Sequence, residues 1–149
     1  MPITNFGPTT NYAKFATLAY PTVTQTLITL TTAGGVIAGT AAQFLAGLLT
    51  VDCQDAQTLT TPTAAAIVAA INGCQVGQSF DVDVVNYGDT TLTIGLGTGV
   101  TKTTIAGVAA VMTLATLVSK RFKFIVTNVT PGSEAVVVWA FGSTAAAVA

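Results

Sequence analysis

The segment Gln78–Asn86, QSFDVDVVN, carries the pattern that decides the fold. Every second residue from Phe80 to Val84 is apolar, and Asp81 and Asp83 lie between them. Side chains along a β-strand point alternately to the two faces of a sheet, so a period of two predicts a strand with one buried and one solvated face. We therefore expect a half-buried strand here, with both aspartates on its outer side.

The same alternation recurs in Arg121–Val129, RFKFIVTNV, where phenylalanines alternate with basic and polar residues. The β-branched composition of other short segments also favours strands. These lie at Thr22–Thr32, Leu48–Cys53, Thr58–Thr60, Thr91–Leu96, Val100–Ile105, Val111–Val118 and Glu134–Phe141. GLGTG at Gly95–Gly99 resembles a phosphate loop, but no Lys-Ser/Thr pair follows it, and we interpret it as a strand bend.

One segment predicts a helix clearly. Pro62–Asn72, PTAAAIVAAIN, has Thr61 as a candidate N-cap, proline at the first helical position and Gly73 after the end. Thr40–Leu49 is expected to hold one or two further helical turns, with Thr40 as N-cap.

Short strands separated by turn residues predict a mainly β fold, an antiparallel β-sandwich or jelly-roll-like barrel with one short α-helix. Residues 1–35 are expected to form an extended N-terminal arm and the first strand, and residues 36–149 a single β-sandwich domain. The arm is rich in proline and carries four aromatic residues, which we expect to pack on apolar surface, either of a neighbouring subunit or of their own domain. They are Phe6, Tyr12, Phe15 and Tyr20.

Charge is scarce in this chain. Charged residues make up 7% of the 149 residues and hydrophobic residues 51%, with a net charge of -1, whereas an average soluble domain has about 25% charged residues. Because charge keeps soluble monomers apart, a neutral, threonine-rich surface favours packing against identical copies. An ordinary domain with a poorly charged surface is the alternative.

Membrane and nucleic-acid partners are not expected. The longest apolar stretches, Val36–Leu49 and Ile105–Val118, are shorter than the roughly 20 residues of a spanning helix, despite a mean hydropathy of +0.70. The N-terminus has no signal-peptide pattern. The pI of 4.9 and the single basic run around Arg121 do not suit phosphate binding.

Catalysis is not expected either, and no cofactor is predicted. The chain has no histidine, so no Ser-His or Cys-His pair can form. Asp81 and Asp83 are a candidate cation site or carboxylate pair, but we interpret them as the solvated outer face of a half-buried strand. Asp52 and Asp55 are a candidate Ca²⁺ site without a ligand spacing pattern, and we expect no metal. Trp139 is expected to pack in the core, with a sugar-binding face as the alternative.

Two cysteines, Cys53 and Cys74, allow one candidate disulfide. They flank the predicted helix, which we expect to run back along the segment after Cys53, so the two thiols could meet. Two free thiols are the alternative, which is more common inside cells.

The segment Ala56–Thr101 resembles a module of structural proteins from tailed bacteriophages, notably cyanophages, and of large algal viruses. The similar elements are TTPTAAAIVAAI, VGQSFDVDVVN, TLTIGLGTGVT and TNVTPGSEAVVVW, and the resemblance extends over residues 40–141. In that family the module belongs to head-decoration or minor capsid proteins and to fibre-like or tail-associated proteins, so the resemblance implies a virion component without fixing its location. We expect a capsid decoration, cement or minor capsid protein that contacts the major capsid protein or other virion proteins. The resemblance implies no catalytic residues, and this chain departs from the pattern in Cys53 and Cys74.

We therefore expect a homo-oligomer, with a trimer as the first prediction, located in the virion. Two other functions stay open. One is a tail or fibre component that contacts the host surface, and the other is a free carbohydrate-binding β-sandwich domain.

Overall fold

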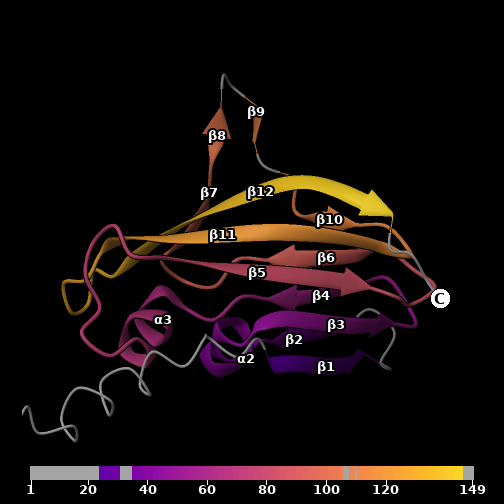
Figure 1. Ribbon diagram of the computed structural model, residues 1–149, viewed down its shortest axis with the longest axis horizontal. Coiled ribbons are helices and arrows are strands. Elements are labelled where there is room, and N and C mark those ends of the chain that lie inside the picture. Colours follow the sequence, from indigo (N-terminus) through magenta and orange to yellow (C-terminus); the bar gives the residue numbers. More distant parts are fainter. Residues whose placement is uncertain (1–23, 31–34, 106–107, 110, 146–149) are drawn as a thin grey trace, which may run out of the picture.

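The computed structural model describes residues 24–30, 35–105, 108–109 and 111–145. Strands dominate, and most belong to two sheets that lie one behind the other (Figure 1). The larger sheet has six strands in the order β1-β3-β5-β11-β12-β7. Their bounds are Thr24–Leu30, Gly47–Cys53, Ser79–Asn86, Val118–Asn128, Ala135–Ala145 and Val100–Lys102, in that order.

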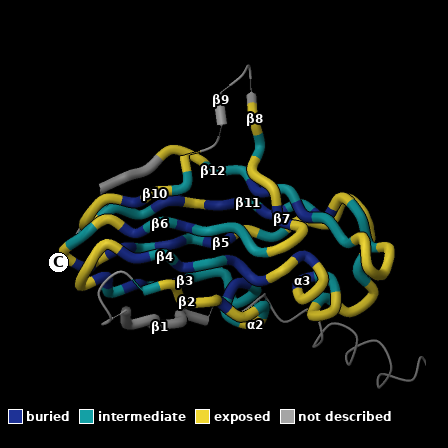
Figure 2. Tube along the Cα trace, turned by 180° about the vertical axis from the view of Figure 1, so that it is seen from behind, coloured by how far each residue is buried: buried dark blue, intermediate teal, exposed yellow. Residues whose placement is uncertain are grey.

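The smaller sheet has four strands in the order β10-β6-β4-β2. Their bounds are Thr113–Leu114, Leu92–Gly95, Gln57–Thr60 and Val36–Ala38. A separate two-stranded hairpin, β8 (Thr104–Ile105) with β9 (Val108–Ala109), projects away from both sheets in the views of Figures 1 and 2. The predicted strand Val100–Ile105 is thus divided between the sheet and the hairpin.

The mainly β prediction is confirmed, but the antiparallel prediction is wrong. Five pairings are parallel: β1 with β3, β3 with β5, β12 with β7, β2 with β4 and β4 with β6. The chain leaves β3, crosses to the smaller sheet as β4 and returns past α3, so β5 enters the larger sheet in the direction of β3. Within the described residues neither sheet closes into a barrel.

One hydrophobic core joins the two sheets. Its buried residues come from the inward positions of both sheets and from the two helices, and Figure 2 shows them along the middle of the strands. The largest are Phe44, Phe122, Phe124, Leu49, Leu59, Ile67, Leu92 and Leu114. Phe124 is central, because its ring stacks on Phe80 at 5.0 Å and meets the edge of Phe44 at 5.7 Å between centroids.

The structure has two short helices among its described residues, one in each of the two segments where helical turns were expected. In α2 (Ala41–Leu45) the Thr40 side chain accepts from the Gln43 amide, and the Gln43 side chain accepts from the Thr40 amide. This capping box satisfies two amide donors at the start of the helix. It supports the prediction of Thr40 as N-cap.

The clearly predicted helix, α3, is shorter than expected and spans Ala64–Ala70. Its N-cap is Thr63, not Thr61, because the Thr61 hydroxyl accepts from the Gly97 amide at 2.9 Å. The Gly95–Gly99 segment is not the predicted bend within one strand, but the turn that leads from β6 in the smaller sheet to β7 in the larger one. A Cβ atom at Gly97 would lie 2.6 Å from the carbonyl oxygens of Thr61 and Pro62. This turn therefore packs directly against the backbone before α3.

The predicted strand Val111–Val118 is mostly wrong, since within it only Thr113–Leu114 and the first residue of β11, Val118, are in strands. Leu117 has a φ of 56°, a left-handed conformation that ends the extended run before β11. The first strand, β1, pairs with β3 along its whole length and so belongs to the larger sheet.

Candidate functional site: the open face of the six-stranded sheet

The pairing of β5 with β11 arranges charge on the face of the larger sheet that points away from the core. Asp83 lies opposite Arg121, and Asp81 lies opposite Lys123. Directly opposed residues on one face of an antiparallel pair are close enough to interact. The sheet therefore carries an acidic row on β5 beside a basic row on β11.

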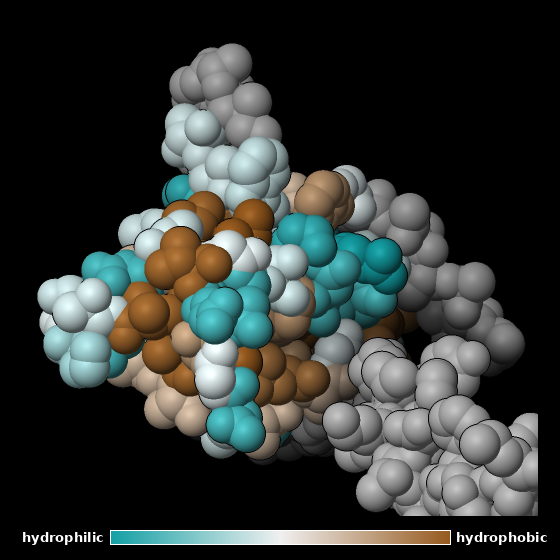
Figure 3. Space-filling view, turned by 60° about the vertical axis from the view of Figure 1, so that its left-hand side comes forward, coloured by the Kyte–Doolittle hydropathy of each residue, from teal (hydrophilic) through white to brown (hydrophobic). Residues whose placement is uncertain are grey.

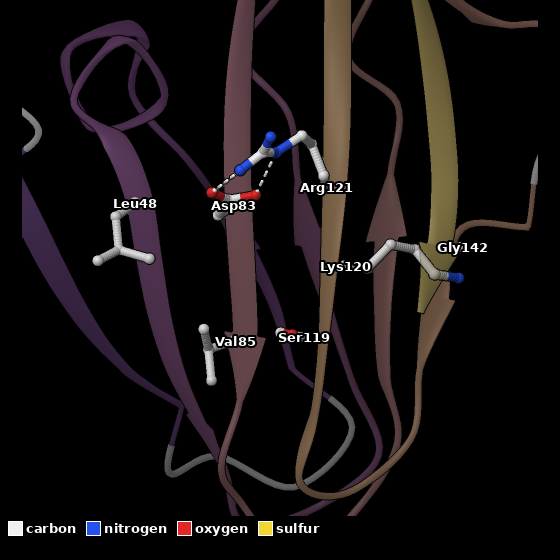
Figure 4. Close-up of a pocket in the computed structure, with 7 residues that line it drawn as sticks. All are labelled: Leu48, Asp83, Val85, Ser119, Lys120, Arg121 and Gly142. Atoms are coloured by element: carbon white, nitrogen blue, oxygen red, sulfur yellow. Dashed lines mark hydrogen bonds and ion pairs between the residues drawn. The ribbon is translucent and has the colours of Figure 1, made fainter. Parts of the chain in front are cut away.

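Both pairs are closed ion pairs. The Arg121 Nε and Nη2 atoms donate to the two carboxylate oxygens of Asp83, each at 2.8 Å (Figure 4). Lys123 Nζ lies 2.8 Å from Asp81 Oδ1. The hydrogen bond to Asp83 and the charge of that carboxylate raise the pKa of Arg121. The four side chains are 35–57% exposed. Exposed pairs of this kind add little to stability. Because the four side chains remain partly exposed, another molecule can contact them.

The strand β12 adds aromatic residues to the same face. Val136 and Val138 are buried, which places the alternate residues Val137, Trp139 and Phe141 on the other side. Trp139 is directly opposite Lys123. The prediction that Trp139 packs in the core is therefore wrong: the indole is half-buried on the open face, and Phe141 is 44% exposed.

A hollow of about 460 Å³ lies in this face. Figure 4 shows its lining residues, which come from four neighbouring strands of the sheet: Leu48, Asp83, Val85, Ser119, Lys120, Arg121 and Gly142. The Asp83–Arg121 ion pair crosses its wall, and Leu48 and Val85 give it an apolar side. We call the outward side chains of β3, β5, β11 and β12 the open face; none of those described is buried.

Lys120, beside the hollow, points the other way. The residue is 7% exposed, and its Nζ atom donates to the carbonyl oxygens of Val111 at 3.1 Å and Thr113 at 2.9 Å. Burial lowers the pKa of this amine. The lysine holds the segment before β10 against the sheet, so its role is structural.

A second hollow, of about 600 Å³, lies where β2, β4 and β6 meet the starts of the helices. Its lining is uncharged and includes Thr40, Thr60, Thr61, Thr63 and Thr98. This surface fits the neutral, threonine-rich character expected from the composition. It presents no titratable group.

The two cysteines are free thiols. Cys53 is buried at the end of β3, and its Sγ atom donates to the Asp55 carbonyl at 2.9 Å. Cys74 follows α3, which lies at the opposite end of the molecule from the end of β3 (Figure 1). The candidate disulfide is therefore absent and the alternative of two free thiols holds, because β4 first carries the chain back along the molecule and the helix starts far from Cys53.

The remaining predicted sites give no further chemistry. The arm residues Phe6, Tyr12, Phe15 and Tyr20 lie outside the described residues. In the part of the chain that the structure describes, no group of three or more potential ligands could hold a metal ion. No helix in that part is long and apolar enough to cross a membrane.

Comparisons with known proteins add no relative. No family model matches the chain, and neither a curated protein nor a solved structure matches it.

Proposed function

We propose that the chain is a non-catalytic structural protein of a virus particle, a β-sandwich brick that decorates or cements a capsid through subunit contacts. The observation that carries the proposal is the open face, in which half-exposed apolar and aromatic side chains surround two ion pairs. Lone monomers rarely keep such a surface uncovered. The resemblance of residues 40–141 to phage and algal-virus modules supports the choice of a virion.

Other surfaces support an assembly role. The projecting hairpin β8–β9 belongs to the segment 103–112, TTIAGVAAVM, which has no charged residue. Figure 3 shows apolar areas directly beside polar ones on the end of the molecule that carries α3. Val76, in the loop after α3, is 61% exposed. Scattered contact points of this kind suit a subunit with several neighbours.

The decisive experiment is binding of the purified chain to capsids that lack it. We expect co-sedimentation with the capsids and a higher temperature of capsid disruption when the chain is bound. Location of the chain on the head in a virion reconstruction would agree with this result. A chain that does not co-sediment with capsids and is absent from virus particles would overturn the proposal.

A second candidate is a tail or fibre component, or a free domain, that binds glycans. The specific observation in its favour is that Trp139 and Phe141 lie on the open face beside charged groups, since sugar rings stack on exposed aromatic side chains. Binding on a glycan array that Trp139→Ser abolishes would favour this function over capsid decoration.

A further inference from the structure

We propose that two copies of the chain pair through their open faces, related by a two-fold axis that runs parallel to the strands above the line between β5 and β11. The inference deepens the proposed function by naming the partner of this face as a second copy, and it rests on that function only for its biological purpose. The pairing itself is a property of the isolated chain. It is argued from the charge rows and from the aromatic and aliphatic residues of the face.

The charge rows select the direction of the axis. The paired acidic residues, Asp81 and Asp83, lie on β5 and the paired basic residues on β11, at matching levels, and Asp52 lies apart from them on β3. Rotation about an axis along the strands places β5 of one copy over β11 of the partner subunit and keeps each residue at the same height along the strand. Asp83 of one copy therefore faces Arg121 of the partner subunit. A two-fold axis across the strands would place acid above acid. Only the first arrangement makes the face complementary to itself, as an isologous contact requires.

The same rotation brings aromatic and aliphatic side chains together. It places β12 of one copy over β3 of the partner subunit, because these strands are equally far from the line between β5 and β11. Leu48 pairs with Asp83, and Phe141 lies between the β12 residues paired with Lys120 and Phe122. Both side chains are thus at the level of the Asp83–Arg121 pair. Phe141 therefore meets the hollow beside Leu48 of the partner subunit, and the contact occurs twice.

The open face is small. Its four strands, about 4.8 Å apart with about seven residues rising about 3.3 Å each, give roughly 440 Å² per copy. Two such faces bury about 900 Å², an area typical of weak, reversible contacts, so we expect a weak dimer. The ion pairs lie at the centre of the contact and supply the orientation, and the half-exposed apolar residues lie on both sides of them.

A charge exchange tests the pairing and its axis together. The double substitution Asp83→Arg with Arg121→Asp keeps an ion pair within each chain and keeps the face complementary to its own copy. Against the natural chain it sets acid over acid and base over base. We expect the exchanged chain to dimerise like the natural one, and mixed pairs to be at least about fivefold rarer than random exchange would give. Native mass spectrometry of a mixture with differently tagged chains measures this ratio.

A second variant tests the aromatic contact. Phe141→Ser should weaken dimerisation by about tenfold or more in analytical ultracentrifugation, because one substitution removes two contacts in each pair. Val76→Ser, at another exposed apolar position, is the matched control and should leave the dissociation constant unchanged. Circular dichroism and the melting temperature confirm that each variant is folded.

Three results would overturn the pairing. They are a natural chain that stays monomeric at millimolar concentration, an oligomer that forms mixed pairs freely with the exchanged chain, and a monomer that binds a glycan array through Phe141. Failure to bind capsids would overturn the proposed function instead, while leaving the pairing intact. A trimer stays compatible with this contact, since two trimers joined by two-fold contacts form a closed hexamer.

Discussion

Gly88 lies directly against the backbone of Cys53, so closely that a Cβ atom at position 88 would overlap the Cys53 nitrogen and carbonyl carbon. This contact joins the turn after β5 to the end of β3. The neighbouring Thr90 amide and hydroxyl both donate to the Cys53 carbonyl. Two adjacent strand ends are thus fixed to each other by backbone contacts that only glycine permits.

Gly88→Ala should therefore destabilise the protein by about 3 kcal/mol, because the new methyl group meets backbone atoms that cannot move aside. Denaturant unfolding measures the change. Gly142→Ala is the matched control: a Cβ there meets nothing within 4 Å, and its effect should stay within about 0.5 kcal/mol. Equal effects of the two substitutions would show that the turn does not rest on β3.

Asn86 is the buried polar centre of the same end. Its Nδ2 atom donates to the carbonyl oxygens of Thr90 at 2.7 Å, Leu114 at 3.2 Å and Ala115 at 3.1 Å, and its Oδ1 atom accepts from the Gly88 amide. Asn86→Asp replaces the donor by an acceptor against three carbonyls. We expect a loss of about 3 kcal/mol at pH 7.

That loss should shrink in acid. Burial raises the pKa of the introduced carboxyl in the folded state above its ordinary value of about 3.9, so the folded state binds the proton more tightly than the unfolded state. The stability of the Asn86→Asp variant relative to the natural chain therefore falls as the pH rises from the ordinary carboxyl pKa through the raised pKa of the folded state. Unfolding at pH 4 and pH 7 checks the sign, and a constant difference would mean that the carboxyl reaches solvent.

The alternating segments were predictable from sequence because their two faces differ in polarity. In Gln78–Asn86 and Arg121–Val129 every apolar residue of one parity is inward, as expected. Lys120 lies two residues before Phe122 and so belongs to the same inward series, which means that its burial could be predicted from the sequence. In Glu134–Phe141 both parities are apolar, and only the pairing of Trp139 with Lys123 decides which side faces out.

Other features depend on contacts distant in sequence. Thr61 and Thr63 are equally good N-caps locally, and the Gly97 amide decides between them. Parallel pairing of β3 with β5 depends on the route of the chain through the second sheet, which alternation does not encode. The open face combines four strands, so its two charge rows emerge only when the register is known.

Lys120 gives a second pH dependence. Its pKa in the folded state is lowered by burial from the ordinary 10.5, so the unfolded state binds the proton more tightly. The natural chain should therefore gain stability relative to Lys120→Met as the pH rises through the folded pKa, a gain that is complete only above 10.5. Denaturant unfolding at pH 7 and pH 10 tests this.

Lys102→Met is the control for the loss of a lysine. Lys102 is exposed on β7, and its substitution should change the free energy of unfolding by less than about 0.5 kcal/mol. A Lys120→Met variant whose stability parallels the natural chain at both pH values would mean that the amine is solvated.

Trp139 and Phe124 should respond very differently to truncation. Phe124 is fully buried between Phe44 and Phe80, and Phe124→Ala should cost about 4 kcal/mol. Trp139 is half-buried on the open face, and Trp139→Ser should cost less than about 1.5 kcal/mol. A cost for Trp139 as large as that for Phe124 would place the indole in the core.

The two thiols should differ in reactivity. Cys53 is buried, and Cys74 is partly exposed in the loop after α3. A maleimide reagent should therefore modify only Cys74 in the native protein and both cysteines in denaturant, because thiol reactivity requires access. Mass spectrometry without reductant counts the labels.

A denatured protein that takes up no label until it is reduced would instead contain the Cys53–Cys74 disulfide, and the two ends of the molecule would then have to approach each other. Cys74→Ser separates the two cases, since it removes the native label but leaves the melting temperature unchanged if the thiols are free.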